Sequence, residues 1–232
     1  MRDRMIIALD TPSAEEALAL GRSLQGHATH VKVGMTLFYA AGPQIVLALR
    51  NLGFQVFVDL KMHDIPHQVA GAVRSLAGLG ASMLTVHAAG GRAMLEAAAR
   101  EAVRLQEEGL PRPRLIAVTV LTSMSAPALS EVGVTRSVPL QVASLAFLAH
   151  EVGIDGVVCS PHEAAEMREL LGEAALVVTP GVRPAWAETG DQARIATPRA
   201  ALDAGASHLV IGRPVTAAPD PVAAFERIVE EG

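Results

Sequence analysis

Eight short apolar runs rich in β-branched residues alternate along this chain with amphipathic stretches of helical period. Such runs are typical of buried strands, and they cover residues 5–9, 30–34, 54–60, 82–87, 115–121, 156–159, 176–179 and 208–212. The helical stretches carry apolar residues three and four apart, and they cover residues 14–24, 37–52, 68–79, 92–108, 140–152, 162–171, 194–204 and 221–231. Strict alternation favours parallel strands, and eight strand–helix pairs predict an α/β fold with one (β/α)8 barrel domain over residues 1–232. A doubly wound open sheet is the alternative.

The composition excludes several classes of protein and several kinds of partner. Half of the residues are apolar, which excludes a disordered chain, and the net charge of −5 provides no basic field for nucleic acid. Cys159 is the single cysteine, so no intrachain disulfide can form, as suits a reducing compartment. No apolar run is long enough for a signal peptide or a membrane span. We therefore expect a cytoplasmic protein with neither nucleic acid nor membrane as a partner.

The chain has 17 arginines but only two lysines, Lys32 and Lys61. A sequence that uses arginine for solvated positive charge keeps lysine where a compact, titratable ammonium is needed. The plain alternative is that both lysines are surface residues that persist by chance.

Both lysines fall in predicted strands or at strand ends, next to aspartates. Asp10 follows the first run, Lys32 lies within the second, Asp59 and Lys61 close the third, and Asp64 lies just beyond. Charge is tolerated in a barrel only near the strand ends, and residues two apart on a strand face the same side. These positions predict a row of alternating lysines and aspartates, which is either catalytic or a structural ion network.

Glycine and arginine recur after the last two predicted strands, at Gly181, Arg183, Gly212 and Arg213. Barrels commonly bind phosphate there, with backbone N–H groups beside glycine and a bidentate arginine clamp. An ordinary strand exit is the alternative for Gly212 and Arg213. The loops at 122–138 and 183–191 are candidate lids over the same face.

The segment Asp59-Leu-Lys61-Met-His-Asp64-Ile65-Pro66 resembles the Asp-x-Lys-x-x-Asp-Ile-Pro signature of the orotidine 5′-monophosphate decarboxylase family. One departure is His67-Gln68, where the family usually has Asn-Thr, so Gln68 replaces a threonine that contacts substrate. The resemblance extends in order over nearly the whole chain, through Ala8-Leu-Asp10, Val31-Lys-Val-Gly34, Leu121-Thr-Ser123, Thr179-Pro-Gly-Val-Arg183-Pro, Gly190-Asp-Gln192 and Ile211-Gly-Arg213-Pro.

The resemblance implies a lyase of pyrimidine biosynthesis that converts orotidine 5′-monophosphate to UMP as a homodimer, without metal or cofactor. By similarity, Lys61 gives a proton to C6 after carbon dioxide leaves, and Asp59 lies against the substrate carboxylate. Lys32 and Asp64 complete the charged array, with Asp64 reaching the site of the neighbouring subunit. The implied substrate-binding residues are Asp10, Lys32, Ile65, Gln68, Thr122, Ser123, Pro180, Arg183, Gln192, Gly212 and Arg213.

Several other functions remain as alternatives. The related 3-keto-L-gulonate 6-phosphate decarboxylases and hexulose-phosphate synthases share Asp-x-Lys-x-x-Asp, but they hold magnesium through a glutamate where this chain has Lys32. A Schiff base on Lys61 needs a neutral amine, whereas neighbouring aspartates stabilise the ammonium. A metal site at His63, Asp64 and His67 is disfavoured because Pro66 interrupts that segment. A non-catalytic nucleotide-binding barrel would bind UMP without turning over the substrate.

Overall fold

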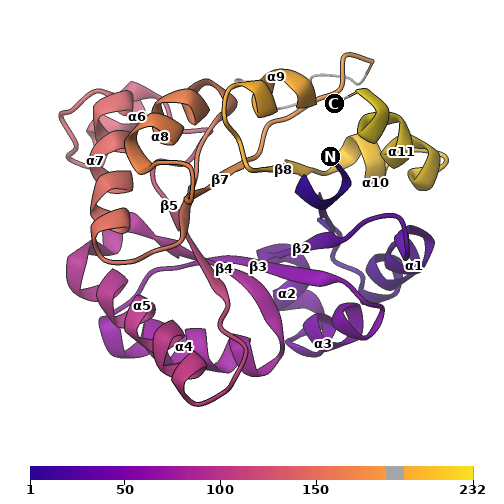
Figure 1. Ribbon diagram of the computed structural model, residues 1–232, viewed down its shortest axis with the longest axis horizontal. Coiled ribbons are helices and arrows are strands. Elements are labelled where there is room, and N and C mark those ends of the chain that lie inside the picture. The colour runs from indigo at the N-terminus through magenta and orange to yellow at the C-terminus, as the bar shows by residue number, and fades with distance from the viewer. Residues whose placement is uncertain (187–195, 232) are drawn as a thin grey trace.

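The computed structural model describes residues 1–186 and 196–231, and it forms a closed barrel of eight parallel strands (Figure 1). Each strand pairs with the next along the chain, and β1 pairs with β8 to close the ring. The predicted (β/α)8 fold is therefore confirmed. The strands are β1 Met5–Ala8, β2 His30–Gly34, β3 Gln55–Met62, β4 Ala81–His87, β5 Arg114–Val118, β6 Gly156–Val158, β7 Leu176–Thr179 and β8 His208–Ile211.

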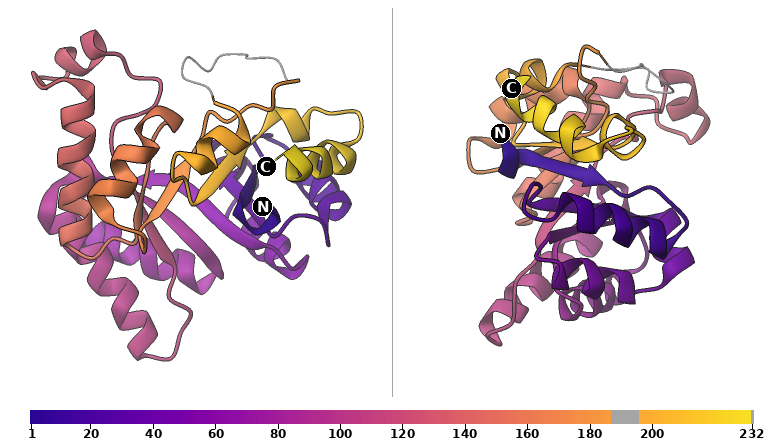
Figure 2. Two further views of the ribbon diagram at one scale, coloured as in Figure 1. Left: turned by 45° about the horizontal axis from the view of Figure 1, so that its top comes forward. Right: turned by 90° about the vertical axis from the view of Figure 1, so that its right-hand side faces the viewer.

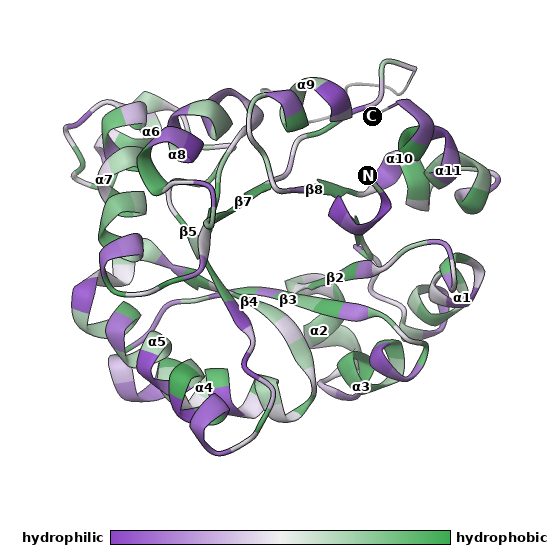
Figure 3. Ribbon diagram, viewed as in Figure 1, coloured by the Kyte–Doolittle hydropathy of each residue, from purple (hydrophilic) through white to green (hydrophobic). Residues whose placement is uncertain are grey.

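Helices surround the barrel on the outside, and Figure 3 shows them striped with apolar and polar residues around largely apolar strands. No helix among the described residues is long and apolar enough to cross a membrane. The α-helices are α1 Ala14–Leu24, α2 Met35–Ala41, α3 Gln44–Asn51, α4 Pro66–Gly78, α5 Gly91–Glu107, α6 Ala126–Glu131, α7 Val138–Glu151, α8 Ala164–Leu171, α9 Pro198–Asp203, α10 Arg213–Thr216 and α11 Pro221–Glu231. The short 3-10 helices are η1 Arg2–Arg4, η2 Ala88–Gly90 and η3 Pro161–Glu163.

Two apolar clusters hold this architecture together. The larger cluster lies between the strands and the surrounding helices. The smaller one lies among inward-facing strand residues, which fill the barrel interior as the fold requires, and it consists of Ile6, Phe57, Met83, Ile116 and Val178.

The stretch 37–52, predicted as one helix, forms two helices instead. α2 ends at Gly42, whose φ of +74° is readily adopted only without a Cβ, and Pro43 precedes α3. The apolar period continues across the break because both helices bury one face against the barrel. The prediction of a single helix was therefore wrong, although Gly42-Pro43 is a helix-ending signal.

Two strands end two or more residues away from their predicted carboxyl ends, whereas the other strands agree with their predictions to within one residue at each end. β3 runs to Met62, two residues past the predicted end at 60, and its pairing with β4 shifts register between Val58 and Met62. β5 ends at Val118, whereas the prediction extended it to 121. The residues after β5 therefore belong to the face on which barrel sites are built.

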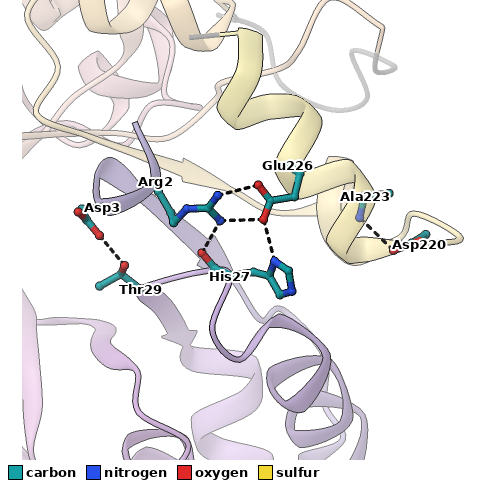
Figure 4. A network of polar contacts seen from close by, with 7 residues as sticks. All are labelled: Arg2, Asp3, His27, Thr29, Asp220, Ala223 and Glu226. Carbon is teal, nitrogen blue, oxygen red and sulfur yellow. Dashed lines mark hydrogen bonds and ion pairs between the residues drawn. The ribbon is translucent and has the colours of Figure 1, made fainter.

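An ion pair connects η1, near the amino end of the chain, to α11, near the carboxyl end. Arg2 of η1 donates two hydrogen bonds, of 2.7 and 2.8 Å, to the carboxylate of Glu226 on α11, and His27 contacts the same carboxylate at 2.7 Å (Figure 4). Hydrogen bonds from Arg2 and His27 lower the pKa of Glu226 to about 2. Figure 2 shows η1 and α11 side by side in two further views, so the first strand is anchored to the last helix.

Candidate active site

A cavity of about 430 Å³ opens at the carboxyl ends of the strands, a volume in the range of small-molecule sites. Its floor consists of barrel residues such as Phe57, Val118, Val158 and Val178, so the reacting part of a ligand would meet apolar walls. Its polar lining comes from the strand ends and loops, and it includes Asp10, Lys32, Asp59, Lys61, Thr122, Arg183 and Arg213.

Lysines and aspartates alternate along one wall of the cavity, as the sequence predicts. Lys32 Nζ lies 2.9 Å from Asp10 Oδ1 and 3.7 Å from Asp59 Oδ2, and Lys61 Nζ lies 2.9 Å from Asp59 Oδ1. The side chains of Lys32 and Asp59 are only 10% and 15% exposed, so solvent screens this ion pair weakly, whereas Asp10 is 60% exposed. The side chain of Lys61 is 30% exposed and lines the cavity, where a ligand can meet it.

Lys61 is the one described residue other than glycine with a positive φ, at +51°. Between the pairs Val58↔Leu84 and Met62↔Val86, β3 has three residues where β4 has only Thr85. A bulge of this kind re-aims side chains, and it is often found next to active sites. The bulge therefore accounts for the ion pair of Lys61 with Asp59, which the sequence attributed to regular strand alternation.

Thr85 contacts the bulge and was not identified from the sequence. Its side chain is fully buried, accepts a hydrogen bond from the Lys61 N–H group at 2.8 Å and donates one to Asp59 Oδ1 at 3.0 Å. The one available signal was a hydroxyl within the otherwise apolar run 82–87, which is too weak to indicate a role.

The opposite part of the cavity is lined by arginines at the ends of β7 and β8. Arg183 is buried and follows Gly181, whose φ is +77°, while Arg213 begins α10 directly after Gly212. Pro180 and Gly212 also line the cavity, as predicted for substrate-binding residues. Four cationic side chains and two carboxylates line the cavity, which leaves a formal charge of +2 and favours an anionic ligand.

Four predicted site residues lie outside the cavity lining of the single chain. Asp64 and Ile65 border a shallow hollow beside it, and both are exposed. Gln68, on α4, and Ser123, in the loop after β5, are exposed and do not line the cavity. Gln192 lies outside the described residues.

Two histidines stack beside Lys61. The rings of His63 and His87 lie 5.1 Å apart with an interplanar angle of 21°, and burial, with the charges of His63 and Lys61, lowers the pKa of His87. The ring of His63 therefore packs against the ring of His87. Across residues 1–186 and 196–231, no three His, Cys, Asp or Glu side chains converge as metal ligands.

The fold and the site together define a barrel protein whose cavity, between a Lys/Asp row and a pair of arginines, suits a small anionic ligand. A model of the orotidine 5′-phosphate decarboxylase / HUMPS family matches residues 3–228. The chain belongs to this family.

Proteins similar in sequence and in structure agree with this assignment. An orotidine 5′-phosphate decarboxylase from Moorella thermoacetica is 54% identical and covers 99% of this chain and 92% of its own length. One from Alkalilimnicola ehrlichii is 55% identical and covers 98% of this chain and 95% of its own length. A crystal structure of orotidine 5′-phosphate decarboxylase from Lactobacillus acidophilus, 41% identical, superposes with a TM-score of 0.88 and covers 99% of this chain and 98% of that one.

Proposed function

We propose that this protein is an enzyme that decarboxylates orotidine 5′-monophosphate to UMP in pyrimidine biosynthesis. The observation that carries the proposal is the joint lining of one cavity by the Lys61 ammonium, 2.9 Å from Asp59, and by the paired arginines Arg183 and Arg213. The ammonium would stabilise and protonate a reacting carbon, and the arginines would bind a phosphate.

The substrate fits the distribution of charge in the cavity. Its phosphate would lie at Arg183 and Arg213, with Pro180 and Gly212 beside it, and its pyrimidine would extend over the apolar floor toward Lys61. Asp10 and Lys32 hold the ribose, and Thr122 and Ser123 take the pyrimidine edge. Ile65, Gln68 and Gln192 complete the proposed binding set.

The chemical step needs a positive group at C6 and a proton for it. The bond between C6 and the carboxyl carbon breaks, carbon dioxide leaves, and the electron pair remains on C6. The Lys61 ammonium stabilises that charge and transfers one proton from Nζ to C6, which forms the C6–H bond of UMP and leaves Lys61 as a neutral amine. Asp59 contacts Lys61 at one oxygen and lies against the substrate carboxylate, which fixes the direction of the ammonium.

The magnesium-dependent sugar-phosphate reaction is the second candidate, because the family name covers both kinds of enzyme. Lys32 argues against it in this chain. Its ammonium lies within 2.9 Å of Asp10 and 3.7 Å of Asp59, so a cation already neutralises the two carboxylates that a magnesium ion would use. The relatives that are 54% and 55% identical carry the name of the decarboxylase.

We also propose a homodimer in which Asp64 completes the site of the partner subunit. Asp64 and Ile65 are exposed beside the cavity, with Ile65 63% exposed, so a second subunit could cover this edge and bring Asp64 to the Lys/Asp row. The whole chain, residues 1–232, would act as one barrel domain in the cytoplasm. Orotidine 5′-monophosphate and UMP would be its ligands, without nucleic acid or membrane as partners.

The test is the absorbance near the orotate band after orotidine 5′-monophosphate is added in the presence of a chelator. The proposal predicts a loss of absorbance at the same rate with and without the chelator. UMP binding without turnover would indicate a binding module, and turnover that the chelator abolishes would indicate metal-dependent chemistry. Borohydride trapping of a lysine adduct with a carbonyl substrate would instead favour Schiff-base chemistry.

A further inference from the structure

The hydroxyl group of Thr85 connects the backbone and the carboxylate of the β3 bulge. A hydroxyl donates one hydrogen, so it gives that hydrogen to Asp59 and accepts from the Lys61 N–H group. We propose that Thr85 is a positioning residue for proton transfer, which fixes the Lys61 backbone and the Asp59 carboxylate relative to each other. This inference rests on the proposed function.

The strand register explains why a side chain is needed at this position. In a regular parallel pair, the Lys61 N–H group would donate to a backbone carbonyl of β4. Three residues of β3 face Thr85 alone, so the ladder is interrupted there. The Thr85 hydroxyl takes the place of the missing carbonyl, and without it a polar group of the sheet would lose its partner.

The same hydroxyl also restricts the charged groups of the cavity. Asp59 Oδ1 accepts both from Thr85 at 3.0 Å and from Lys61 Nζ at 2.9 Å, so two donors fix one carboxylate oxygen. A positive φ is unfavourable for a residue with a Cβ, and the Lys61 backbone keeps it while the Thr85 contact holds. Loss of the hydroxyl would release both the backbone and the carboxylate.

The substitution Thr85→Val keeps the shape of the side chain and removes the hydroxyl. We expect kcat for orotidine 5′-monophosphate to fall by about 10- to 100-fold, the effect of losing hydrogen bonds to charged and constrained groups. The affinity for UMP should change by less than about threefold, because Thr85 does not line the cavity.

Thr119 provides a matched control. It is also a buried threonine, it follows β5, and its hydroxyl donates to the Val158 carbonyl at 3.2 Å without contacting the bulge. Thr119→Val should lower stability to a similar extent and leave both kcat and the exchange rate of the Lys61 amide unchanged. Thr85→Ser, which keeps the hydroxyl, should retain the parental kcat within about threefold.

If Thr85→Val turns over with the parental kcat, the proposal is wrong. If it fails to fold, Thr85→Ser and Thr85→Ala replace it, since they differ by the hydroxyl oxygen alone, and equal kcat in these two variants would overturn the proposal. Deuterium exchange of the Lys61 amide provides a readout without turnover. We expect exchange at least about tenfold faster in Thr85→Val, and unchanged exchange contradicts the contact even if the parent protein has no decarboxylase activity.

Discussion

At the scale of single residues, the positive charges of the cavity form two separate groups. Lys32 and Lys61 are held by carboxylates at one wall, whereas Arg183 and Arg213 line the part formed by the ends of β7 and β8. In the proposed function, a phosphate at the arginines would lie away from the reacting carbon, and its binding energy would help to close the site around the substrate.

Arg213→Ala tests the assignment of the phosphate to the two arginines. We expect kcat/KM to fall by at least about a thousandfold, because phosphate binding energy is realised in the transition state as well as in affinity. Added guanidinium should restore part of the activity, which separates loss of the charged group from loss of folding. Arg22→Ala, which removes an exposed arginine from α1, is the control. Parental kinetics in Arg213→Ala would refute the phosphate assignment.

The residues of the Lys/Asp row could be predicted because charge at a barrel strand end is rare and readily recognised. Lys32, Asp59 and Lys61 lie in contact along the row as predicted, but the geometry at Lys61 comes from a bulge. A bulge depends on how two strands pair, and Thr85 lies 24 residues from its partner Lys61. No local pattern in the sequence encodes that contact.

At the scale of elements, the amino ends of β2 and β8 bring two histidines together on the face opposite the cavity. The rings of His30 and His208 lie 5.7 Å apart, edge to face, and Ser207 contacts His208 at 3.0 Å. Burial, with His30 and Arg4 nearby, lowers the pKa of His208 to about 4, and burial lowers that of His30 despite Asp3. The folded barrel therefore favours the neutral form of both histidines.

This pair predicts that the barrel loses stability in mild acid. Folding disfavours the protonated form of His208, so its contribution to stability is complete above pH 6.5, the ordinary pKa of a histidine, and is lost as the pH falls toward 4. At about 1.4 kcal/mol per pKa unit, the loss is on the order of 3 kcal/mol. Denaturant unfolding at several pH values should show it.

The control for this prediction compares two histidines. His208→Gln should flatten the pH dependence of the free energy of unfolding, whereas His162→Gln, at an exposed position, should leave it unchanged. Equal slopes in the parent protein and in His208→Gln would show that the acid sensitivity arises elsewhere.

The elements themselves were largely predictable, because each strand is a short β-branched run and each helix buries one apolar face. The helix predicted at 14–24 is α1, and the side chain of Ser13, just before it, accepts from the Glu16 N–H group at 3.2 Å. The break at Gly42-Pro43 was missed because the apolar period continues from α2 into α3. At this break the apolar pattern favours one continuous helix, but Gly42 and Pro43 favour an end, and these two residues decide where α2 stops.

At the scale of the whole molecule, the cavity formed by a single barrel is not lined by Asp64. This residue is exposed beside the cavity, and its Oδ1 accepts from the adjacent Ile65 N–H group at 2.6 Å. The proposed dimer would add one carboxylate to each cavity and lower the formal charge of +2 to +1.

Mixing two inactive variants tests the shared site. Lys61→Ala and Asp64→Ala homodimers should each be nearly inactive, because every site lacks one group. In a mixed two-fold dimer both defects fall in one site and leave the other complete, so random exchange should restore about a quarter of all sites. If labelled subunits exchange and the activity stays at the sum of the two variants, Asp64 serves its own chain and the shared site is wrong.

The proposed role of Lys61 is to protonate C6 as carbon dioxide leaves. To test this role, orotidine 5′-monophosphate labelled with ¹³C at the carboxylate is incubated with the protein in D2O, and both products are followed by NMR. We expect labelled carbon dioxide and UMP in equal amounts, with one deuterium at C6. We also expect a folded Lys61→Ala variant to bind UMP but to form neither product. If Lys61→Ala forms UMP within about tenfold of the parental rate, another group or water supplies the proton, and Lys61 is not the donor.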